Sequence, residues 1–225
     1  MKKVFVCFHP YDRKLAVETV LSLIYSLDEA KKVCDRIDFC EISGCCYIAD
    51  VRNTLATVFL QSDSDELIFI DSDLGWDEMA LAKIIKADRG VIGGAYPYKI
   101  PNIKGFPVKY KKDEAGNIIK DEITGYIEAE YIPGGFMKVQ RWVFEKLQSL
   151  HPEWETSKAI NKTGIVYNFF QTGLVFKNDK TWYGEDVAFC KFCTDAGIKI
   201  WIEPDITFIH GKITGNYLEQ VLEAA

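Results

Sequence analysis

Two carboxylates follow a short apolar run near the middle of the chain. Leu67-Ile68-Phe69-Ile70 is typical of a strand buried on both faces, and Asp71-Ser72-Asp73 comes directly after it. Open α/β sheets bind ligands beyond the carboxyl ends of their strands. At this spacing Asp71 and Asp73 can converge on one hard divalent cation and on the diphosphate that it bridges. The alternative is a solvated loop or helix cap, as for the same tripeptide at 63–65, which precedes the strand and predicts only a polar turn.

A second acidic pair, Glu185 and Asp186, stands at the start of a predicted helix. Acidic residues at a helix N-terminus can simply complement the helix dipole. They can also act in catalysis, where one carboxylate removes a proton from an attacking hydroxyl. Trp182 and Tyr183 come just before the pair. Their aromatic faces can stack on a sugar ring, or they can belong to the core.

A histidine occupies the end of another apolar run. His210 follows Ile206-Thr207-Phe208-Ile209, so it is expected at the end of a strand, as Asp71 is. Alone it would be interpreted as a structural histidine. Two carboxylates and one imidazole together form a mixed oxygen and nitrogen site that is compatible with Mn²⁺ or Mg²⁺. Cys190 and Cys193 lie inside a predicted helix without a second cysteine pair, which favours core packing over zinc binding.

The elements that must position these residues alternate between strand and helix patterns in the first half of the chain. This alternation predicts a mostly parallel sheet with helices on both faces. The helix expected over 15–32 carries an apolar stripe of Val17, Val20, Leu21, Ile24 and Leu27. The other first-half predictions are strands at 4–8, 37–42, 67–70 and 90–93 and helices at 49–60 and 77–86.

The second half of the chain predicts antiparallel additions to that sheet. A hairpin loop is expected over 113–117, between extended segments at 108–112 and 118–120. Further strands are predicted at 125–132, 199–202 and 206–209, with helices at 141–150 and 185–196. The fold class is therefore α/β with a mixed sheet. We expect one domain over 1–225, with residues 1–100 as a nucleotide-binding half and 101–225 as an acceptor-binding half.

Composition narrows the possible partners. The 225 residues carry a net charge of −6, and the Lys and Arg residues are scattered, which argues against nucleic acid as the main partner. No apolar stretch reaches the roughly 18 residues that a transmembrane helix needs. The N-terminal apolar run ends at His9-Pro10 without a cleavage site, so it predicts a strand rather than a signal peptide. Seven cysteines without framework spacing indicate reduced thiols and a cytoplasmic protein.

The order of these motifs resembles that of GT-A-fold glycosyltransferases, whose sheet is Rossmann-like. The series is most similar to small, soluble, family-2-like enzymes of large DNA viruses and phages, which would place the protein in a host cytoplasm. The segment Gly93-Gly94-Ala95-Tyr96-Pro97-Tyr98-Lys99 adds to this likeness. The motifs that carry it are Ala49-Asp50-Val51-Arg52-Asn53-Thr54-Leu55, Phe69 to Asp73, Gly134-Gly135-Phe136-Met137 with Arg141, Tyr183-Gly184-Glu185-Asp186, and His210.

The resemblance implies a role for each of these positions. Asp73 would be the main metal ligand and His210 would complete the metal site, while Asp71 would reach the ribose or the metal. Together with Ser72 between them, the two aspartates would also contact the donor nucleotide. Asp186 would be the catalytic base with Glu185 beside it. The remaining implied contacts are Pro10, Tyr11, Arg52 and Asn53 with the nucleotide, and Gly134, Gly135, Trp182 and Tyr183 with the donor sugar or acceptor. The related sequences have small residues where this chain has Asp50-Val51.

The resulting hypothesis is a metal-dependent hexosyltransferase-like enzyme of glycan biosynthesis. It would move a sugar from a nucleoside-diphosphate sugar, UDP- or GDP-linked, to a hydroxyl of a glycan or another acceptor. A single displacement with Asp186 as base would invert the anomeric configuration. Two alternatives are a sugar-nucleotide pyrophosphorylase, although His9 to Arg13 is not the Gly-rich phosphate loop that such an enzyme needs, and a catalytically silent carbohydrate-binding module.

Overall fold

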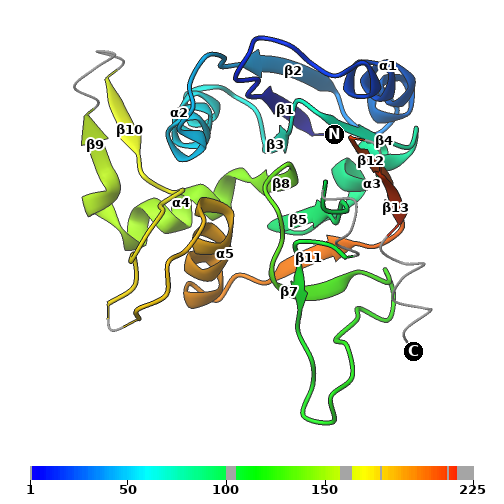
Figure 1. Cartoon of the computed structure of the whole chain (residues 1–225). Helices are drawn as coiled ribbons and strands as arrows, with labels where there is room; N and C mark the ends of the chain where they lie inside the picture. The colour runs from blue at the N-terminus through cyan, green and yellow to red at the C-terminus, as the bar shows by residue number, and fades with distance from the viewer. Residues whose placement is uncertain (1, 100–104, 158–163, 178, 212, 217–225) are drawn as a thin grey trace.

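A mixed β-sheet runs through the centre of the molecule (Figure 1). The computed structural model describes residues 2–99, 105–157, 164–177, 179–211 and 213–216. Within them, eight strands form the main sheet in the order β2-β1-β3-β8-β5-β11-β7-β6. The strands are β1 (Lys3–Phe8), β2 (Arg36–Glu41), β3 (Glu66–Ile70), β5 (Val91–Gly94), β6 (Lys109–Tyr110), β7 (Ile127–Tyr131), β8 (Phe136–Gln140) and β11 (Ile200–Glu203).

The first-half strands and the second-half strands interleave in this sheet. β1 pairs in parallel with both β2 and β3, as the alternating pattern predicted. β8 then runs antiparallel between β3 and β5, while β11 pairs in parallel with β5 and antiparallel with β7. The sheet is therefore mixed, with antiparallel additions from the second half. The hairpin prediction is also confirmed, because Asp113 N–H donates to the Asn117 carbonyl and Lys112 bridges to Ile118.

Helices cover both faces of the sheet (Figure 1). α1 (Val17–Lys31) and α3 (Ala80–Lys86) pack with one another and cover the face that carries Val6 and Ile68. α2 (Ile48–Gln61), α4 (Arg141–Leu150) and α5 (Glu185–Asp195) cover the other face, which carries Phe5 and Phe69. The side chains of alternate residues of β1 and β3 therefore pack into two separate cores.

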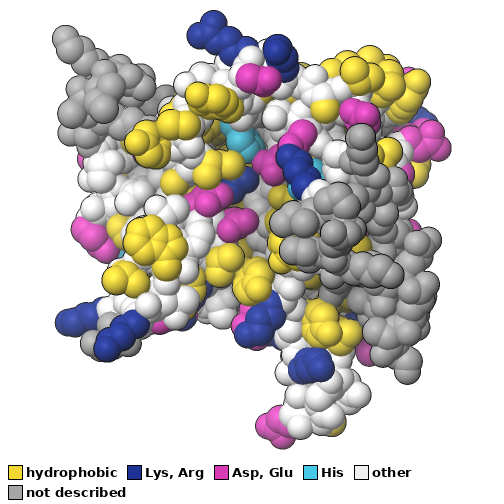
Figure 2. Space-filling model, viewed as in Figure 1, with side chains coloured by type: hydrophobic (Ala, Val, Ile, Leu, Met, Phe, Trp, Pro, Cys, Tyr) yellow, Lys and Arg dark blue, Asp and Glu magenta, His cyan; other side chains and the backbone are white. Residues whose placement is uncertain are grey.

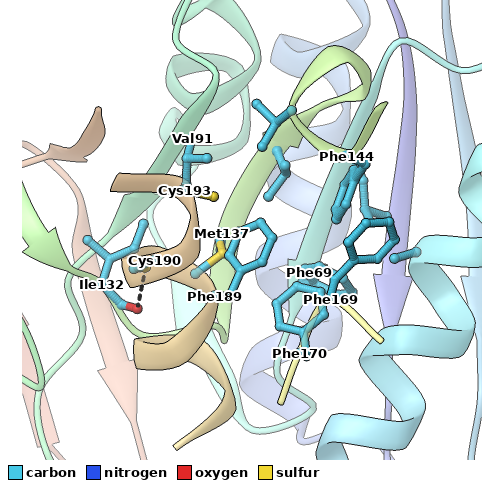
Figure 3. Close-up of a cluster of buried hydrophobic side chains, with 14 of the residues drawn as sticks. Phe69, Val91, Ile132, Met137, Phe144, Phe169, Phe170, Phe189, Cys190 and Cys193 are labelled. Carbon is cyan, nitrogen blue, oxygen red and sulfur yellow. Dashed lines mark hydrogen bonds between the residues drawn. The ribbon is translucent and has the colours of Figure 1, made fainter. Parts of the chain in front are cut away.

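The core beneath α2, α4 and α5 is rich in aromatic side chains (Figure 3). Phe170 stacks on Phe189 with ring centroids 4.5 Å apart, and Phe69 meets Phe170 edge-on at 5.3 Å. Cys190 and Cys193 are fully buried among these rings, and the Cys190 thiol donates to the Ile132 carbonyl. The prediction that this cysteine pair packs in the core is confirmed.

A smaller sheet lies at one side of the main sheet. β4 (Leu74–Trp76) and β13 (Ile213–Asn216) flank β12 (Thr207–His210), and the pairing sets His210 opposite Leu74. The sequence predicted β12 but gave no signal for β4. A separate ribbon of β9 (Glu155–Ser157) and β10 (Ile165–Tyr167) follows a 3₁₀ turn at Pro152–Trp154. Within the described residues, no helix has the length and apolar character needed to cross a membrane.

α1 has the predicted position, but the face that packs against the protein is the one opposite its apolar stripe. The side chains of Val17, Leu21 and Ile24 are exposed. The buried face instead consists of Thr19, Ser22, Ser26 and Ala30. Hydrogen bonds decide the orientation, because the Ser22 hydroxyl accepts the Trp76 N–H at 2.8 Å and the Ser26 hydroxyl accepts the Trp76 indole N–H at 3.0 Å.

Candidate active site

The carboxyl ends of β1 and β3 bring a histidine and an aspartate together. The two strands are parallel, with Phe8 opposite Ile70, so the residues that follow them are neighbours. The Nε2 atom of His9 lies 2.8 Å from Oδ1 of Asp71. The other ring nitrogen of His9, Nδ1, is buried without a hydrogen-bond partner among the described residues. His9 therefore fixes Asp71 through Nε2, while its Nδ1 atom stays without a hydrogen-bond partner among the described residues.

Asp71 is held by two further side chains. Arg52 Nη2 lies 3.4 Å from Oδ1, and the Tyr96 hydroxyl donates to Oδ2 at 3.3 Å. Burial alone would raise the pKa of Asp71, but the hydrogen bond from His9 and the charge of Arg52 outweigh it and hold the pKa well below its usual range. Asp71 is thus a fixed, ionised carboxylate at neutral pH.

Arg52 joins the two acidic pairs that the sequence singled out. Its side chain is only 2% exposed, and its guanidinium contacts Glu185 on one side and Asp71 on the other. Burial would lower the pKa of Arg52, yet the charges of Asp71, Glu185 and Asp186 raise it overall. Burial raises the pKa of Glu185 although the charge of Arg52 opposes it, and the neighbouring Asp186 adds to the rise. The strand-end aspartate and the start of α5 therefore belong to one buried charge network.

Gly134 and Gly135 let the loop before β8 pass directly over this network. The Gly135 carbonyl accepts the Asp71 N–H at 2.8 Å, and the Gly134 N–H donates to Oδ2 of Asp186 at 3.2 Å. A Cβ on Gly134 would lie 2.7 Å from Arg52 Nη2, and one on Gly135 would lie 2.5 Å from the Tyr96 hydroxyl. The close approach that requires glycine here is to the protein's own charged groups.

Asp73 and His210 meet beside the network, from the segment before β4 and the end of β12. His210 Nε2 lies 3.7 Å from Oδ1 of Asp73, and Lys99 contacts the other carboxylate oxygen. The Nδ1 atom of His210 lies 2.7 Å from the Pro97 carbonyl, so it donates there and leaves the Nε2 lone pair facing Asp73. Burial lowers the pKa of His210, which favours the neutral, metal-binding form.

The donor set suits a hard or borderline divalent cation at Asp73 and His210. A carboxylate oxygen and an imidazole lone pair that face one another are ligands for Mn²⁺ or Mg²⁺. Within the described ranges, however, no group of three His, Cys, Asp or Glu side chains is arranged to hold a metal. Asp71 directs its oxygens to His9, Arg52 and Tyr96 instead, so its metal contact stays a prediction.

Two residues predicted to contact the nucleotide make structural contacts. The Asn53 amide is buried; it donates to Asn168 at 2.9 Å and to the Phe170 carbonyl at 3.1 Å, and it accepts the Phe170 N–H at 2.8 Å. The Ser72 carbonyl accepts the Ala16 N–H at 2.8 Å, which ties the turn between the two aspartates to the start of α1. Their contacts with a nucleotide stay predictions.

The other predicted residues line cavities or are exposed to solvent. Pro10 lines a cavity of about 600 Å³ with Phe8, Phe39 and Ser43, while the exposed Tyr11 borders a second cavity of about 230 Å³ with His9. Trp182 is 75% exposed. Tyr183 donates its hydroxyl to Asp179 at 2.5 Å and lines a cavity of about 480 Å³ along α5. Figure 2 shows acidic side chains and a histidine in a hollow near the centre of this face.

His9, Tyr96 and Lys99 were not predicted as site residues. For His9 the signal was present, because it follows β1 as Asp71 follows β3 and parallel strands end at the same edge of a sheet. Tyr96 lies after β5 and Lys99 further along the same loop. Tyr96 follows a strand that runs in the same direction as β3, so the same signal applied to it, whereas no periodicity or spacing links Lys99 to the aspartates.

Comparison with known proteins identifies the fold. No protein-family model and no curated protein matches this chain by sequence. Among solved structures, the protein A197 from STIV matches with a TM-score of 0.55 and 19% identity over 93% of this chain and 85% of its own. The glycosyltransferase GalNAc-T7, solved with UDP, GalNAc and Mn²⁺, matches with a TM-score of 0.55 and 14% identity over 93% of this chain. The chain has a GT-A-like fold. It spans only 44% of the GalNAc-T7 chain.

Proposed function

We propose that the chain is a metal-dependent glycosyltransferase that moves a sugar from a nucleoside-diphosphate sugar to an acceptor hydroxyl. The observation that carries this proposal is the convergence of Asp73 and His210 next to the network of Asp71, Arg52 and Glu185. The GT-A-like fold and the likeness to GalNAc-T7, solved with UDP and Mn²⁺, support the same reading.

Asp73 and His210 would hold the divalent cation. The cation would offset the negative charge that develops on the departing nucleoside diphosphate, which removes the need for a protonating acid. Lys99 already places a positive charge at Asp73. When the donor binds, the ammonium group of Lys99 can move from Asp73 to the diphosphate, because phosphate oxygens attract it as the Asp73 carboxylate does.

The nucleoside would bind beyond the end of β1. Pro10 and Tyr11 border the two cavities on either side of this loop, and the larger one, at about 600 Å³, has room for a nucleoside. Phe8 and Phe39 supply apolar ring surface there, and Ser43 supplies a polar group. The donor base, uracil or guanine, would be selected by such polar contacts.

Asp186 would act as the catalytic base. Glu185 is engaged with Arg52, whereas the Asp186 carboxylate accepts only the backbone N–H groups of Gly134 and Val187 among the hydrogen bonds of the described residues. Asp186 can therefore accept a proton from an acceptor hydroxyl while Glu185 keeps Arg52 in place. Attack from the face opposite the leaving diphosphate would invert the anomeric centre.

The acceptor would approach along α5. The cavity of about 480 Å³ near Tyr183 also contains Tyr131 and charged side chains of both signs, a mixture that suits a sugar. Gly134 and Trp182 lie on the segments that flank Asp186, and they would border the donor sugar or the acceptor. A glycan or another hydroxyl compound is the proposed acceptor class.

A thermal-shift panel of UDP-, GDP-, dTDP- and CMP-sugars, each with and without Mn²⁺, tests the proposal. A ligand at a hundred times its Kd should raise Tm by about 5–10 °C for a chain of this size. We expect one nucleotide class to stabilise the protein only with Mn²⁺, and Asp73→Ala to abolish the shift. Asp63→Ala is the matched control, because Asp63 belongs to the second Asp-Ser-Asp tripeptide and pairs with Lys3 and Arg36 on the surface. A flat panel with folded protein would contradict the proposal and favour a silent carbohydrate-binding module.

A further inference from the structure

The larger cavity beyond β1 brings a carboxylate and a guanidinium to one space. Glu41, at the end of β2, and Arg13, in the loop after β1, both line its volume of about 600 Å³. Both residues are exposed. Among the described residues, neither side chain makes a hydrogen bond or an ion pair, with the other or with a third residue. Both charged groups are therefore available to a ligand.

Aromatic rings form the apolar part of the same cavity. Phe39 stacks on Phe8 with ring centroids 6.4 Å apart and ring planes 20° apart. Phe8 is buried, whereas the Phe39 side chain is 49% exposed. Planar bases stack on aromatic side chains of this kind in nucleotide-binding proteins. The cavity thus offers ring surface and two opposite charges to one flat, polar ligand.

The loops that carry Arg13 and Glu41 are joined by their backbones. The Gly44 N–H, in the loop after β2, donates to the Tyr11 carbonyl in the loop after β1 at 3.1 Å. Arg13 has a φ of 62°, in the left-handed region that a residue with a Cβ rarely adopts, and its N–H donates to the Pro10 carbonyl at 3.4 Å. A tight turn therefore holds Arg13 at the same cavity as Glu41.

Guanine is the base whose edges match both charged groups. Its N1–H and 2-amino group are neighbouring donors that one carboxylate accepts together, and its O6 and N7 atoms are neighbouring acceptors for a guanidinium. Uracil has one ring N–H between two carbonyl groups, so a carboxylate accepts one hydrogen bond and lies against a carbonyl oxygen. Adenine and cytosine have a ring acceptor beside the amino group, which a carboxylate also repels.

We propose that the sugar donor is a guanosine-diphosphate sugar, with Glu41 and Arg13 as the residues that select guanine. The inference rests on the proposed function, since it names the base of the donor that the glycosyltransferase uses. Glu41 accepts the N1–H and the 2-amino group, Arg13 donates to O6 and N7, and the base stacks on Phe39. GalNAc-T7 was solved with UDP, but its likeness to this chain, at 14% identity, concerns the fold alone.

Isothermal titration calorimetry of the full chain with GDP and with UDP, each with Mn²⁺, tests the inference. We expect GDP to bind at least about tenfold more tightly than UDP, the scale of one bidentate contact to the right base. Arg13→Asn should weaken GDP binding about tenfold, and asparagine tolerates a φ of 62°. Lys14→Asn is the matched control, because it removes the same charge one residue further along, where the ammonium lies 3.9 Å from the Asp12 carboxylate. This control should bind GDP within about twofold of wild type.

Inosine diphosphate isolates the Glu41 contact, because it keeps O6, N7 and N1–H but lacks the 2-amino group. Wild type should bind it about tenfold more weakly than GDP, as expected for a lost hydrogen bond to a charged group. In Glu41→Ala the two nucleotides should bind within about twofold of one another, since the acceptor is gone. Circular dichroism checks that each variant is folded.

The outcomes separate this inference from the proposed function. Tighter binding of UDP than of GDP would overturn the choice of guanine and leave the glycosyltransferase proposal in place. The same holds if wild type binds GDP and inosine diphosphate equally, or if a preference for GDP persists in Glu41→Ala. A folded wild-type chain that binds no nucleoside diphosphate with Mn²⁺ would overturn both.

Discussion

Arg52 and Glu185 form a buried ion pair between the second turn of α2 and the first residue of α5, and the same guanidinium contacts Asp71. The two helices thereby share one cation with the strand-end aspartate. His9 and Tyr96 also hold Asp71, but Arg52 contacts both Asp71 and Glu185 and is almost inaccessible to solvent. Arg52 therefore acts as a positioning residue.

Replacing Arg52 by methionine should destabilise the protein by about 3–5 kcal/mol. The variant keeps much of the side-chain volume but leaves Asp71 and Glu185 as poorly compensated carboxylates in a buried place. Urea denaturation at pH 7 measures the loss. Gln61→Ala, at the exposed end of the same helix, should stay within about 0.5 kcal/mol of wild type. A loss below about 1 kcal/mol for Arg52→Met would show that solvent already stabilises the two carboxylates.

Gly135→Ala should displace Asp71. The new Cβ would collide with the Asp71 carboxylate and lie 2.5 Å from the Tyr96 hydroxyl, and both are held by other contacts. We expect a loss of about 1–3 kcal/mol in stability, as for other overpacked sites, with loss of any Mn²⁺-dependent thermal shift. Gly184→Ala is the control, because its Cβ would meet Asp186 Oδ1 at an ordinary 3.4 Å and its φ of −71° suits alanine. Equal stability of the two variants would contradict the collision.

Much of the framework could be predicted because it depends on local patterns. The helix at 141–150 has its predicted bounds, and the buried strand before Asp71 lies where its apolar run indicates. The sequence did not predict β8, because a lysine at the centre of a strand indicates a solvent-facing position. In the structure this lysine, Lys138, is fully buried. Only the fold shows that Glu66, 3.0 Å away, compensates that charge. A buried ion pair between strands that are far apart in the sequence has no signature in sequence periodicity.

The orientation of α1 could not be predicted for a similar reason. Hydrophobic spacing favours burial of Leu21 and Ile24, but the hydrogen bonds that Trp76 donates to Ser22 and Ser26 determine which face packs. Those partners lie on β4, which the sequence did not reveal. For the candidate site, strand ends located Asp71, Asp73 and His210, and the same argument applied to His9 and Tyr96, whereas Lys99 lies further along a loop without a regular pattern. The roles proposed for these residues stay predictions.

Asp186→Asn should leave donor binding intact and slow transfer by about a hundredfold or more, the scale of a lost general base. The amide keeps an oxygen for the Gly134 N–H but cannot accept a proton from the acceptor. Steady-state kinetics, with donor affinity measured separately, tests this expectation. Glu185→Gln serves as the comparison, because Glu185 pairs with Arg52 and its loss should reduce stability first. Wild-type turnover in Asp186→Asn would show that Asp186 is not the base and would favour Glu185 instead.

Cys40 should be an unusually reactive thiol. It lies opposite Cys7 in the parallel pairing of β1 and β2, and a hydrogen bond from the Cys7 thiol lowers the pKa of Cys40 to about 7 despite partial burial. Thiolates are the reactive form, so alkylation by iodoacetamide should accelerate as pH rises through about 7 rather than through about 8.5. Mass spectrometry of the modified peptides follows each cysteine, with the exposed Cys46 as a measure of reagent access. Cys7→Ala removes the donor and should move the midpoint upward by about one unit or more, while Cys7→Ser keeps a donor and should hold it near 7. An unchanged midpoint in Cys7→Ala would assign the reactivity to some other group.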